Sequence, residues 1–195
     1  MSNAVLVEQV RRKIIIRFNR PELRNPLSIA VLEELASILS DIEGRDDIDV
    51  LIFTGTGTVF ASGADLREIA SVDSDGAAVF ALRGQNLMKR ISELAIETIA
   101  AINGICFGGA LDLALASKKR IASPDAVFSH PGANLGIITG WGGTQRLPRL
   151  VGEAMALEMF FTAKRVTAKE ALSCGLIDAV AEDALELAME WEQDE

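Results

Sequence analysis

Two glycine-containing pairs, Ser62-Gly63 and Gly108-Gly109, could each direct a backbone amide at one and the same oxygen atom. Amide donors that are held in place before the reaction stabilise an oxyanion that develops in a transition state. The alternative is that both pairs are only tight turns, and spacing alone favours the turns.

The sequence lacks the residues that several other kinds of site require. The chain has one histidine, His130, and no Gly-x-Ser-x-Gly segment, so a catalytic triad is not expected. Cys106 and Cys174 stand alone without a CxxC pair, which predicts neither a zinc site nor a disulfide framework. The segment 55–57, Gly-Thr-Gly, lacks the later glycine and lysine of a phosphate-binding loop. We therefore expect no metal site.

The formal charge of -9 belongs to one end of the chain. Residues 1–169 contain as many acidic as basic residues, whereas residues 170–195 contain nine acidic residues and no lysine or arginine. Nucleic-acid binding needs a clustered basic face, so we do not expect it. No signal peptide is visible, and the apolar stretch 99–117 is interrupted by Asn103 and Asp112, which argues against a membrane span. A reduced, cytoplasmic protein is expected.

Two buried strands lead into the glycine-containing loops. Residues 50–54 and 99–103 are continuous apolar runs, as in a parallel sheet covered by helices on both faces. Each run is followed by a glycine-containing loop, and a helix is expected further on, within 75–94 and from the Gly108-Gly109 turn to about Ser117. Ligands bind at the carboxyl ends of strands in open α/β sheets, so these loops are the predicted site.

The remaining elements fit one α/β domain spanning residues 1–195. Strands are predicted at 5–9, 13–18, 121–122, 126–129 and 177–180, and helices at 28–44, within 140–150, at 153–163, from 167 to about 175, and at 183–191. Ser28 is a predicted helix N-cap, and Thr167 with Glu170 forms a predicted capping box.

Five segments carry a resemblance to a known family. In order and spacing the chain resembles the crotonase superfamily, the enoyl-CoA hydratases and isomerases, at residues 19–28, 60–66, 101–113, 142–147 and 167–180. The resemblance implies an α/β, crotonase-like spiral of repeated strand-strand-helix units that assembles as a homo-trimer or a hexamer. It also implies an acyl-CoA thioester as substrate and no permanently bound cofactor.

The same resemblance implies the catalytic residues. The two oxyanion-binding amides would be those of Ser62 and Gly109, and the first of the two family glutamates corresponds to Asp112. The second glutamate is replaced by Gly132, which disfavours the addition of water and favours an isomerase or a decarboxylase/lyase. A non-catalytic acyl-CoA-binding or assembly subunit is the alternative.

Substrate-binding residues follow from the matching motifs. Arg24 is expected near the phosphates of coenzyme A, with a surface role as the alternative, and the acyl pocket is expected to involve Gly108, Gly132 and Trp141. The segment that would meet the adenine comprises Ser62, Gly63, Ala64, Asp65 and Leu66. We expect His130 to be a hydrogen-bonded structural residue rather than a substitute acid or base.

The end of the chain differs from the family pattern. Members usually continue into further C-terminal helices, so the resemblance implies a core spiral over about 1–180 and a shortened helical end over about 181–195. A further alternative is that the chain is a fragment or an early-terminated member whose exposed apolar surface drives association.

Overall fold

Six strands form the larger sheet of the protein, whose computed structural model describes residues 4–191. The strand order is β1-β2-β4-β7-β9-β12, and every neighbouring pair is parallel except β1 with β2. The strands are β1 (Val5–Val10), β2 (Lys13–Phe18), β4 (Val50–Gly55), β7 (Glu97–Ile102), β9 (Lys119–Ala122) and β12 (Ala179–Val180).

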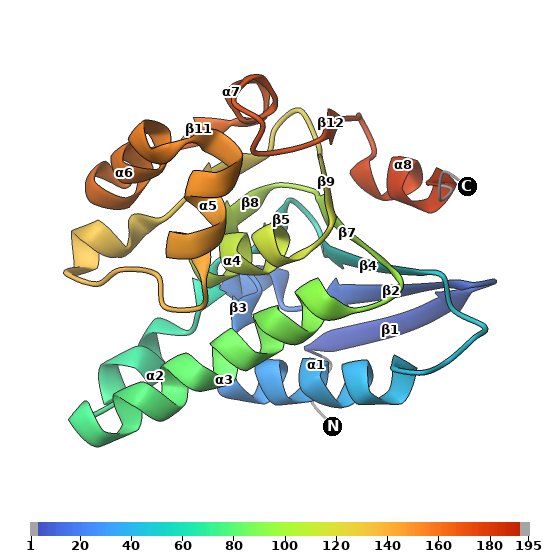
Figure 1. Ribbon diagram of the computed structural model, residues 1–195, viewed down its shortest axis with the longest axis horizontal. Helices are drawn as coiled ribbons and strands as arrows, with labels where there is room; N and C mark the ends of the chain where they lie inside the picture. Colours follow the sequence, from blue (N-terminus) through green and yellow to red (C-terminus); the bar gives the residue numbers. More distant parts are fainter. Residues whose placement is uncertain (1–3, 192–195) are drawn as a thin grey trace.

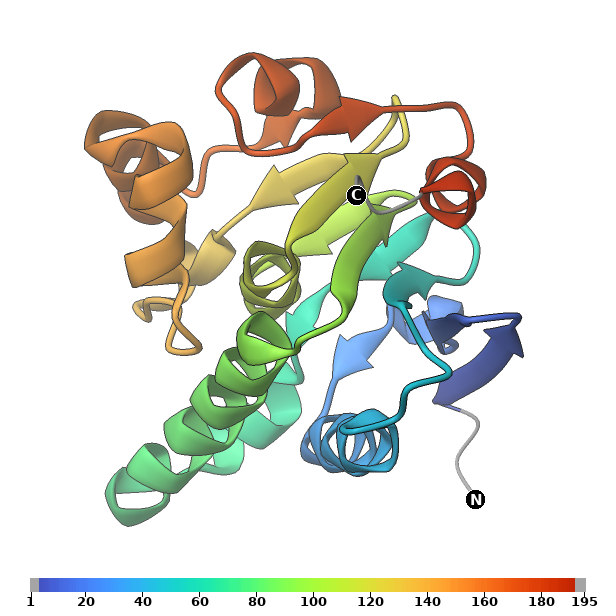
Figure 2. The same cartoon turned by 45° about the vertical axis from the view of Figure 1, so that its right-hand side comes forward.

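A second sheet has the order β11-β10-β8-β5, and its strands are shorter. They are β11 (Val166–Thr167), β10 (Val127–Ser129), β8 (Ile105–Phe107) and β5 (Val59–Ala61). Along the chain, β4 is followed by β5, β7 by β8, and β9 by β10, so each turn of the chain contributes one strand to each sheet. Figures 1 and 2 show the resulting stack, and the expected α/β spiral is confirmed.

Helices other than α4 lie around the outside of this spiral (Figure 1). The helices are α1 (Ile29–Ile42), α2 (Leu66–Ser71), α3 (Ser74–Glu93), α4 (Gly109–Ala116), α5 (Gly143–Val151), α6 (Glu153–Thr162), α7 (Ala168–Ser173) and α8 (Ala184–Glu190). The predicted caps are confirmed: the Ser28 side chain accepts from the Val31 N–H, and Thr167 and Glu170 form the reciprocal capping box. The expected C-terminal helix is α8, and residues 192–195 of the expected helical end lie outside the described residues.

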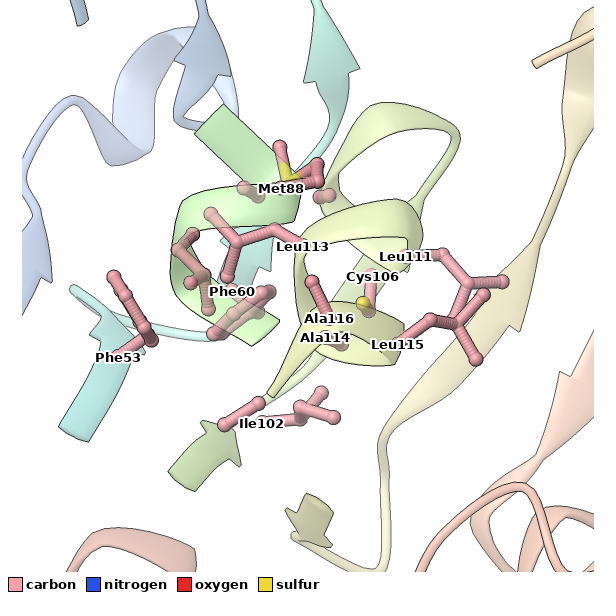
Figure 3. Packing of buried hydrophobic residues seen from close by; sticks show 14 of the residues in the cluster. Phe53, Phe60, Met88, Ile102, Cys106, Leu111, Leu113, Ala114, Leu115 and Ala116 are labelled. Atoms are coloured by element: carbon pink, nitrogen blue, oxygen red, sulfur yellow. The ribbon is translucent and has the colours of Figure 1, made fainter. Parts of the chain in front are cut away.

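Helix α4 lies inside the core rather than on its surface. Every residue from Ala110 to Ala116 is buried. Figure 3 shows Leu113 directed toward Met88 and Phe60, while Leu111 and Leu115 point to the other side of the helix. This burial explains the apolar stretch that covers β7 to α4. Among residues 4–191, no helix is long and apolar enough to cross a membrane.

Helix α8 covers part of the outer face of the larger sheet. Its Ala184 and Ala188 pack in one cluster with Ile52, Ile99 and Ile121, which alternate with residues facing the main core. Lys13 at the start of β2 donates from Nζ to the carbonyls of Met189 and Trp191, at 2.6 Å each. A cation is favourable at the carbonyl end of a helix, so this contact fixes α8 on the sheet.

Several short elements were not predicted from the sequence. Strands β5 and β8 have three residues each, and β3 (Pro26–Leu27) and β6 (Gly63–Ala64), which form a two-stranded parallel pair, have two each. Such segments are too short to display a hydrophobic period. Helix α2 and the two 3-10 turns, η1 (Pro21–Leu23) and η2 (Pro131–Leu135), are similarly short.

Candidate active site

Strand β6 and the start of α4 approach each other closely because glycines occupy both sides. Gly63 has a φ of +92°, and a Cβ placed on it would lie 2.6 Å from the Phe107 carbonyl oxygen and 2.9 Å from the Gly109 nitrogen. No other residue type fits this position without moving the backbone. The two glycine-containing loops predicted from the sequence therefore do come together.

The prediction that Ser62 offers an oxyanion-binding amide is wrong. Its backbone N–H already donates to the carbonyl of Arg24, at 2.9 Å. This hydrogen bond connects the end of the Arg24-Asn25 turn, where both residues have positive φ, to the chain that enters β6. A donor that is satisfied within the fold is not available to a substrate oxygen.

The geometry of the β3–β6 pair leaves the N–H of Ala64 without a partner in β3. In a parallel ladder the residue that bonds to the partner strand alternates with one whose N–H points to the opposite side. Pro26 lies opposite Gly63 and has no N–H, so Gly63 is the bonded residue at that pair and the N–H of Ala64 points away from β3. Ala64 lines the cavity described below.

Gly109 offers another backbone N–H at the cavity. It is the first residue of α4, and the N–H groups of a first helical turn have no acceptor within the helix. A Cβ on Gly109 would collide with the indole of Trp141, which packs across it and against Gly84. The absence of a side chain thus allows Trp141 to lie over the start of α4 while the amide stays accessible from the cavity, which both residues line.

Asp112 is a carboxyl group held completely inside the protein. Its Oδ2 accepts from the Thr139 hydroxyl and from the Trp141 N–H, the latter at 3.3 Å, and the carboxylate lies beside Gly143 at the start of α5. Desolvation outweighs these donors and raises the pKa of Asp112 to about 7. The group can therefore both accept and release a proton near neutral pH.

His130 lies next to Asp112. The ring is buried, its centroid is 5.1 Å from that of Phe160, and neither Nδ1 nor Nε2 has a hydrogen-bond partner in the structure. The prediction of a hydrogen-bonded structural histidine is therefore wrong.

The two groups do not form an ion pair. His130 Nε2 is 3.7 Å from Asp112 Oδ1, which is too far for a hydrogen bond. Burial lowers the pKa of His130 to about 4, whereas that of Asp112 is about 7. Burial thus favours the neutral forms of both groups between these two values.

A cavity of about 410 Å³ connects these groups. Ala64, Gly109, Asp112 and His130 meet at its wall, and the rest of the lining is mostly apolar. The apolar part comes from α2, α3, the segment around η2 and α6: Leu66, Ile69, Val72, Ala77, Phe80, Ala81, Pro131, Ala133, Leu135, Ile137, Ile138 and Phe160. The predicted residues Ser62, Gly108, Gly132 and Trp141 also line it.

Other predicted residues lie away from this cavity or serve the fold. Arg24 is not among the lining residues, and its backbone carbonyl accepts the Ser62 N–H. Asp65 is buried, caps the start of α2 by accepting from the Arg67 N–H, and forms a 2.6 Å ion pair with Arg67. The sequence indicated no role for Thr139. This residue lies in the same loop as Trp141, and its hydroxyl donates a hydrogen bond to Asp112.

Comparison with known proteins identifies the family of the chain. A family model described as enoyl-CoA hydratase/isomerase matches residues 11–193. The short-chain-enoyl-CoA hydratase of Clostridium acetobutylicum is 37% identical over 92% of this chain and 69% of its own length. A protein of Bacillus subtilis named as a probable enoyl-CoA hydratase is 44% identical over 84% of this chain. The chain spans 64% of the length of that second relative.

Solved structures lead to the same family. The crystal structure of enoyl-CoA hydratase from Bacillus anthracis superposes with a TM-score of 0.89 at 37% sequence identity, covering 96% of this chain and 76% of that one. The structure of enoyl-CoA hydratase from Thermoplasma volcanium gives a TM-score of 0.91 at 34% identity, covering 97% and 76%. The chain belongs to the enoyl-CoA hydratase/isomerase family of the crotonase superfamily.

Proposed function

We propose that the protein forms and reprotonates the enolate of an acyl-CoA thioester, with the amides of Ala64 and Gly109 binding the thioester oxygen and Asp112 transferring the proton. The observation that carries this proposal is the convergence of these three groups on one largely apolar cavity. Loss of one such amide donor typically costs roughly 3 kcal/mol of transition-state stabilisation.

Asp112 suits the transfer of a proton to and from carbon. A general acid or base works best when its pKa is near the working pH, and burial raises the pKa of Asp112 to about 7. The Thr139 hydroxyl and the Trp141 amide hold Oδ2, whereas Oδ1 lies beside Gly143 and 3.7 Å from His130 Nε2 without a hydrogen bond to either. We assign the proton transfer to Oδ1.

The substrate class rests on the family and on the cavity. The relatives are named as enoyl-CoA hydratases, including one for short-chain substrates. The apolar lining fits the acyl part of a thioester. Coenzyme A is here part of the substrate, and Arg24 remains the proposed contact for its phosphates.

Within the family, one carboxylate is sufficient for some reactions. Asp112 alone can move a proton between two carbons, as an isomerase requires, or protonate the enolate left by a decarboxylase. Water addition needs a second group that holds the water, and Gly132 cannot be that group because it has no side chain.

Turnover of a thioester panel tests this function. Purified protein should turn over at least one member of a set of enoyl-, dienoyl- and malonyl-type CoA thioesters. Asp112→Asn should lower kcat by about 100- to 10,000-fold, while calorimetry finds unchanged thioester affinity. Unchanged turnover in Asp112→Asn would remove Asp112 from the mechanism, and a protein that neither binds nor turns over any thioester would refute the function.

The second candidate is an acyl-CoA-binding subunit without chemistry. Gly132, in place of a carboxylate, favours it, because the site then lacks one of the family's two acidic groups. Tight binding of thioesters without turnover of any panel member, and without proton exchange at their α-carbon, would support this candidate against the enzyme.

The cellular location and the assembly are predictions too. We expect a cytoplasmic homo-trimer or hexamer that binds neither nucleic acid nor membranes. Light scattering and fractionation of cells test these points separately from the chemistry.

A further inference from the structure

Two buried side chains in the cavity wall, Asp112 and His130, carry polar atoms without hydrogen-bond partners. Asp112 Oδ1, His130 Nδ1 and His130 Nε2 are inaccessible and have no hydrogen bond in the structure. A buried polar atom without a partner destabilises the folded protein. Most of the cavity wall is apolar, and a polar atom of a bound molecule would supply the missing partner.

The separation of the two side chains fits one shared oxygen atom. Asp112 Oδ1 and His130 Nε2 are 3.7 Å apart. A single oxygen can lie at about 2.8 Å from both of them, which is a normal hydrogen-bond distance. A water molecule can donate one hydrogen to the carboxylate and the other to the lone pair of the imidazole nitrogen.

The loop that follows His130 leaves no room for a side chain at position 132. A Cβ on Gly132 would lie 2.6 Å from the carbonyl oxygen of Ile137, and the Ile137 N–H donates to the Gly132 carbonyl at 3.0 Å. This tight loop excludes any side chain at Gly132 without a rearrangement. His130, two residues earlier, is the polar side chain that this loop presents to the cavity.

We propose that His130 is a second catalytic residue, which together with Asp112 holds the oxygen that is added to, or removed from, the β-carbon of the acyl chain. This inference rests on the proposed function and narrows it to the interconversion of a 2-enoyl thioester and water with a 3-hydroxyacyl thioester. It replaces the expectation of an isomerase or a decarboxylase with a hydration that uses one carboxylate and one imidazole.

The step balances with these two residues alone. A lone pair of the water oxygen forms the bond to the β-carbon, and the electrons of the carbon–carbon double bond move to the thioester oxygen, which the amides of Ala64 and Gly109 hold. The water gives one proton to Asp112 Oδ1, and the neutral carboxyl group then gives that proton to the α-carbon. His130 Nε2 accepts the other water hydrogen, which stays on the new hydroxyl group.

The protonation states agree with these roles. Orienting water through a lone pair requires a neutral imidazole, and burial lowers the pKa of His130 to about 4. Asp112 has to gain and lose a proton, which its pKa of about 7 permits. The positive charge of Arg146 lowers the pKa of Asp112, but by less than burial raises it. The shift of the His130 pKa comes from burial alone.

Two substitutions of His130 test the proposal. His130→Leu removes both unpaired nitrogens and should lower kcat for hydration of a 2-enoyl-CoA by about 100-fold. His130→Gln keeps an acceptor oxygen and should stay within about tenfold of the parent kcat. Because His130→Leu also removes unpaired buried groups, its melting temperature should equal or exceed that of the parent protein.

Exchange of the α-hydrogens of a saturated acyl-CoA in D₂O separates this proposal from the proposed function. That exchange uses Asp112 and the two amides but no water at the β-carbon, so both His130 variants should retain it. Hydration at the parent rate in His130→Leu would overturn the role of His130, and so would equal losses in His130→Leu and His130→Gln with a lowered melting temperature. Absence of exchange with the parent protein would instead refute the proposed formation of the enolate.

Discussion

Asp112 is subject to two opposing effects within its own surroundings. Complete burial disfavours its charged form, while the Thr139 hydroxyl, the Trp141 amide and the positive charge of Arg146 favour it. Burial dominates, so the folded protein holds this carboxyl group protonated over a pH range in which an unfolded chain would ionise it. The raised pKa keeps a proton available on Asp112 near neutral pH, and it lowers the free energy of unfolding at and above that pH.

This cost predicts how Asp112→Asn changes stability. The pKa is 3.8 in the absence of the fold and about 7 within it, so between these values the unfolded state binds fewer protons and the folded state loses stability as the pH rises. Asparagine does not titrate. The free energy of unfolding of Asp112→Asn minus that of the parent should therefore increase between pH 4 and 7, by up to about 4 kcal/mol.

Urea denaturation of both proteins across pH 4–8 measures this difference. His130 contributes in the opposite direction, since its lowered pKa makes stability fall as the pH falls from 6.5 toward 4, but it is present in both proteins and its effect cancels to first order. A difference that stays flat over the whole range would mean that the folded protein does not hold Asp112 protonated.

At the scale of elements, the spacing between β6 and α4 determines whether the two amides can reach one oxygen. Gly63→Ala would place a methyl group against the Phe107 carbonyl and the Gly109 nitrogen, and would push the donors apart. We expect kcat to fall by about 100-fold, because misplacing one oxyanion donor is comparable to losing it.

Gly44→Ala is the matched control for this substitution. Gly44 also has a positive φ, +81°, but a Cβ there would meet nothing within 4 Å. It should carry the same kind of backbone strain and lose stability by roughly 1 kcal/mol while kcat is unchanged. Equal kcat values in Gly63→Ala and Gly44→Ala would show that the close approach is not needed for activity.

The sequence predicted the long elements and the two glycine-containing loops, because hydrophobic period and cap residues are local properties. It could not predict which amide at the first loop is free. That depends on the positive φ of Gly63 and on the pairing with Pro26, a residue without an N–H. Nor could it predict the surroundings of His130, since Asp112 and Phe160 come from helices distant in the sequence.

At the scale of the whole molecule, the acidic end of the chain is attached to a neutral body. Lys13 binds the carbonyls at the end of α8, and the ammonium of Lys119 lies 5.2 Å from the ring centroid of Trp191. The basic residues of the sheet therefore meet this segment directly. These contacts use the backbone carbonyls and the indole of the segment, not its carboxylates.

The surface of α6 predicts self-association. Leu157 and Phe161 lie four residues apart on one face of the helix and are 51% and 72% exposed. Large apolar side chains that are exposed together mark contact surfaces. Light scattering should give a mass well above the 20.9 kDa of one chain, and Phe161→Asp should shift the population toward that value.

Phe161→Leu preserves an apolar contact and should retain the assembly. If the parent protein is already monomeric at micromolar concentration, or if the aspartate and leucine variants have the same mass, α6 is not the contact surface.

The central claim is that the protein forms the enolate of an acyl-CoA thioester. Hydrogen exchange at the α-carbon tests this claim most directly. NMR of butanoyl-CoA in D₂O should detect deuterium entering the α-position with the parent protein, and at a rate lower by at least about 100-fold with Asp112→Asn. Exchange requires only the buried carboxyl group and the amides of Ala64 and Gly109, and does not depend on the later fate of the enolate. Absence of exchange with a protein that binds butanoyl-CoA, or equal exchange by the Asp112→Asn variant, would contradict the account.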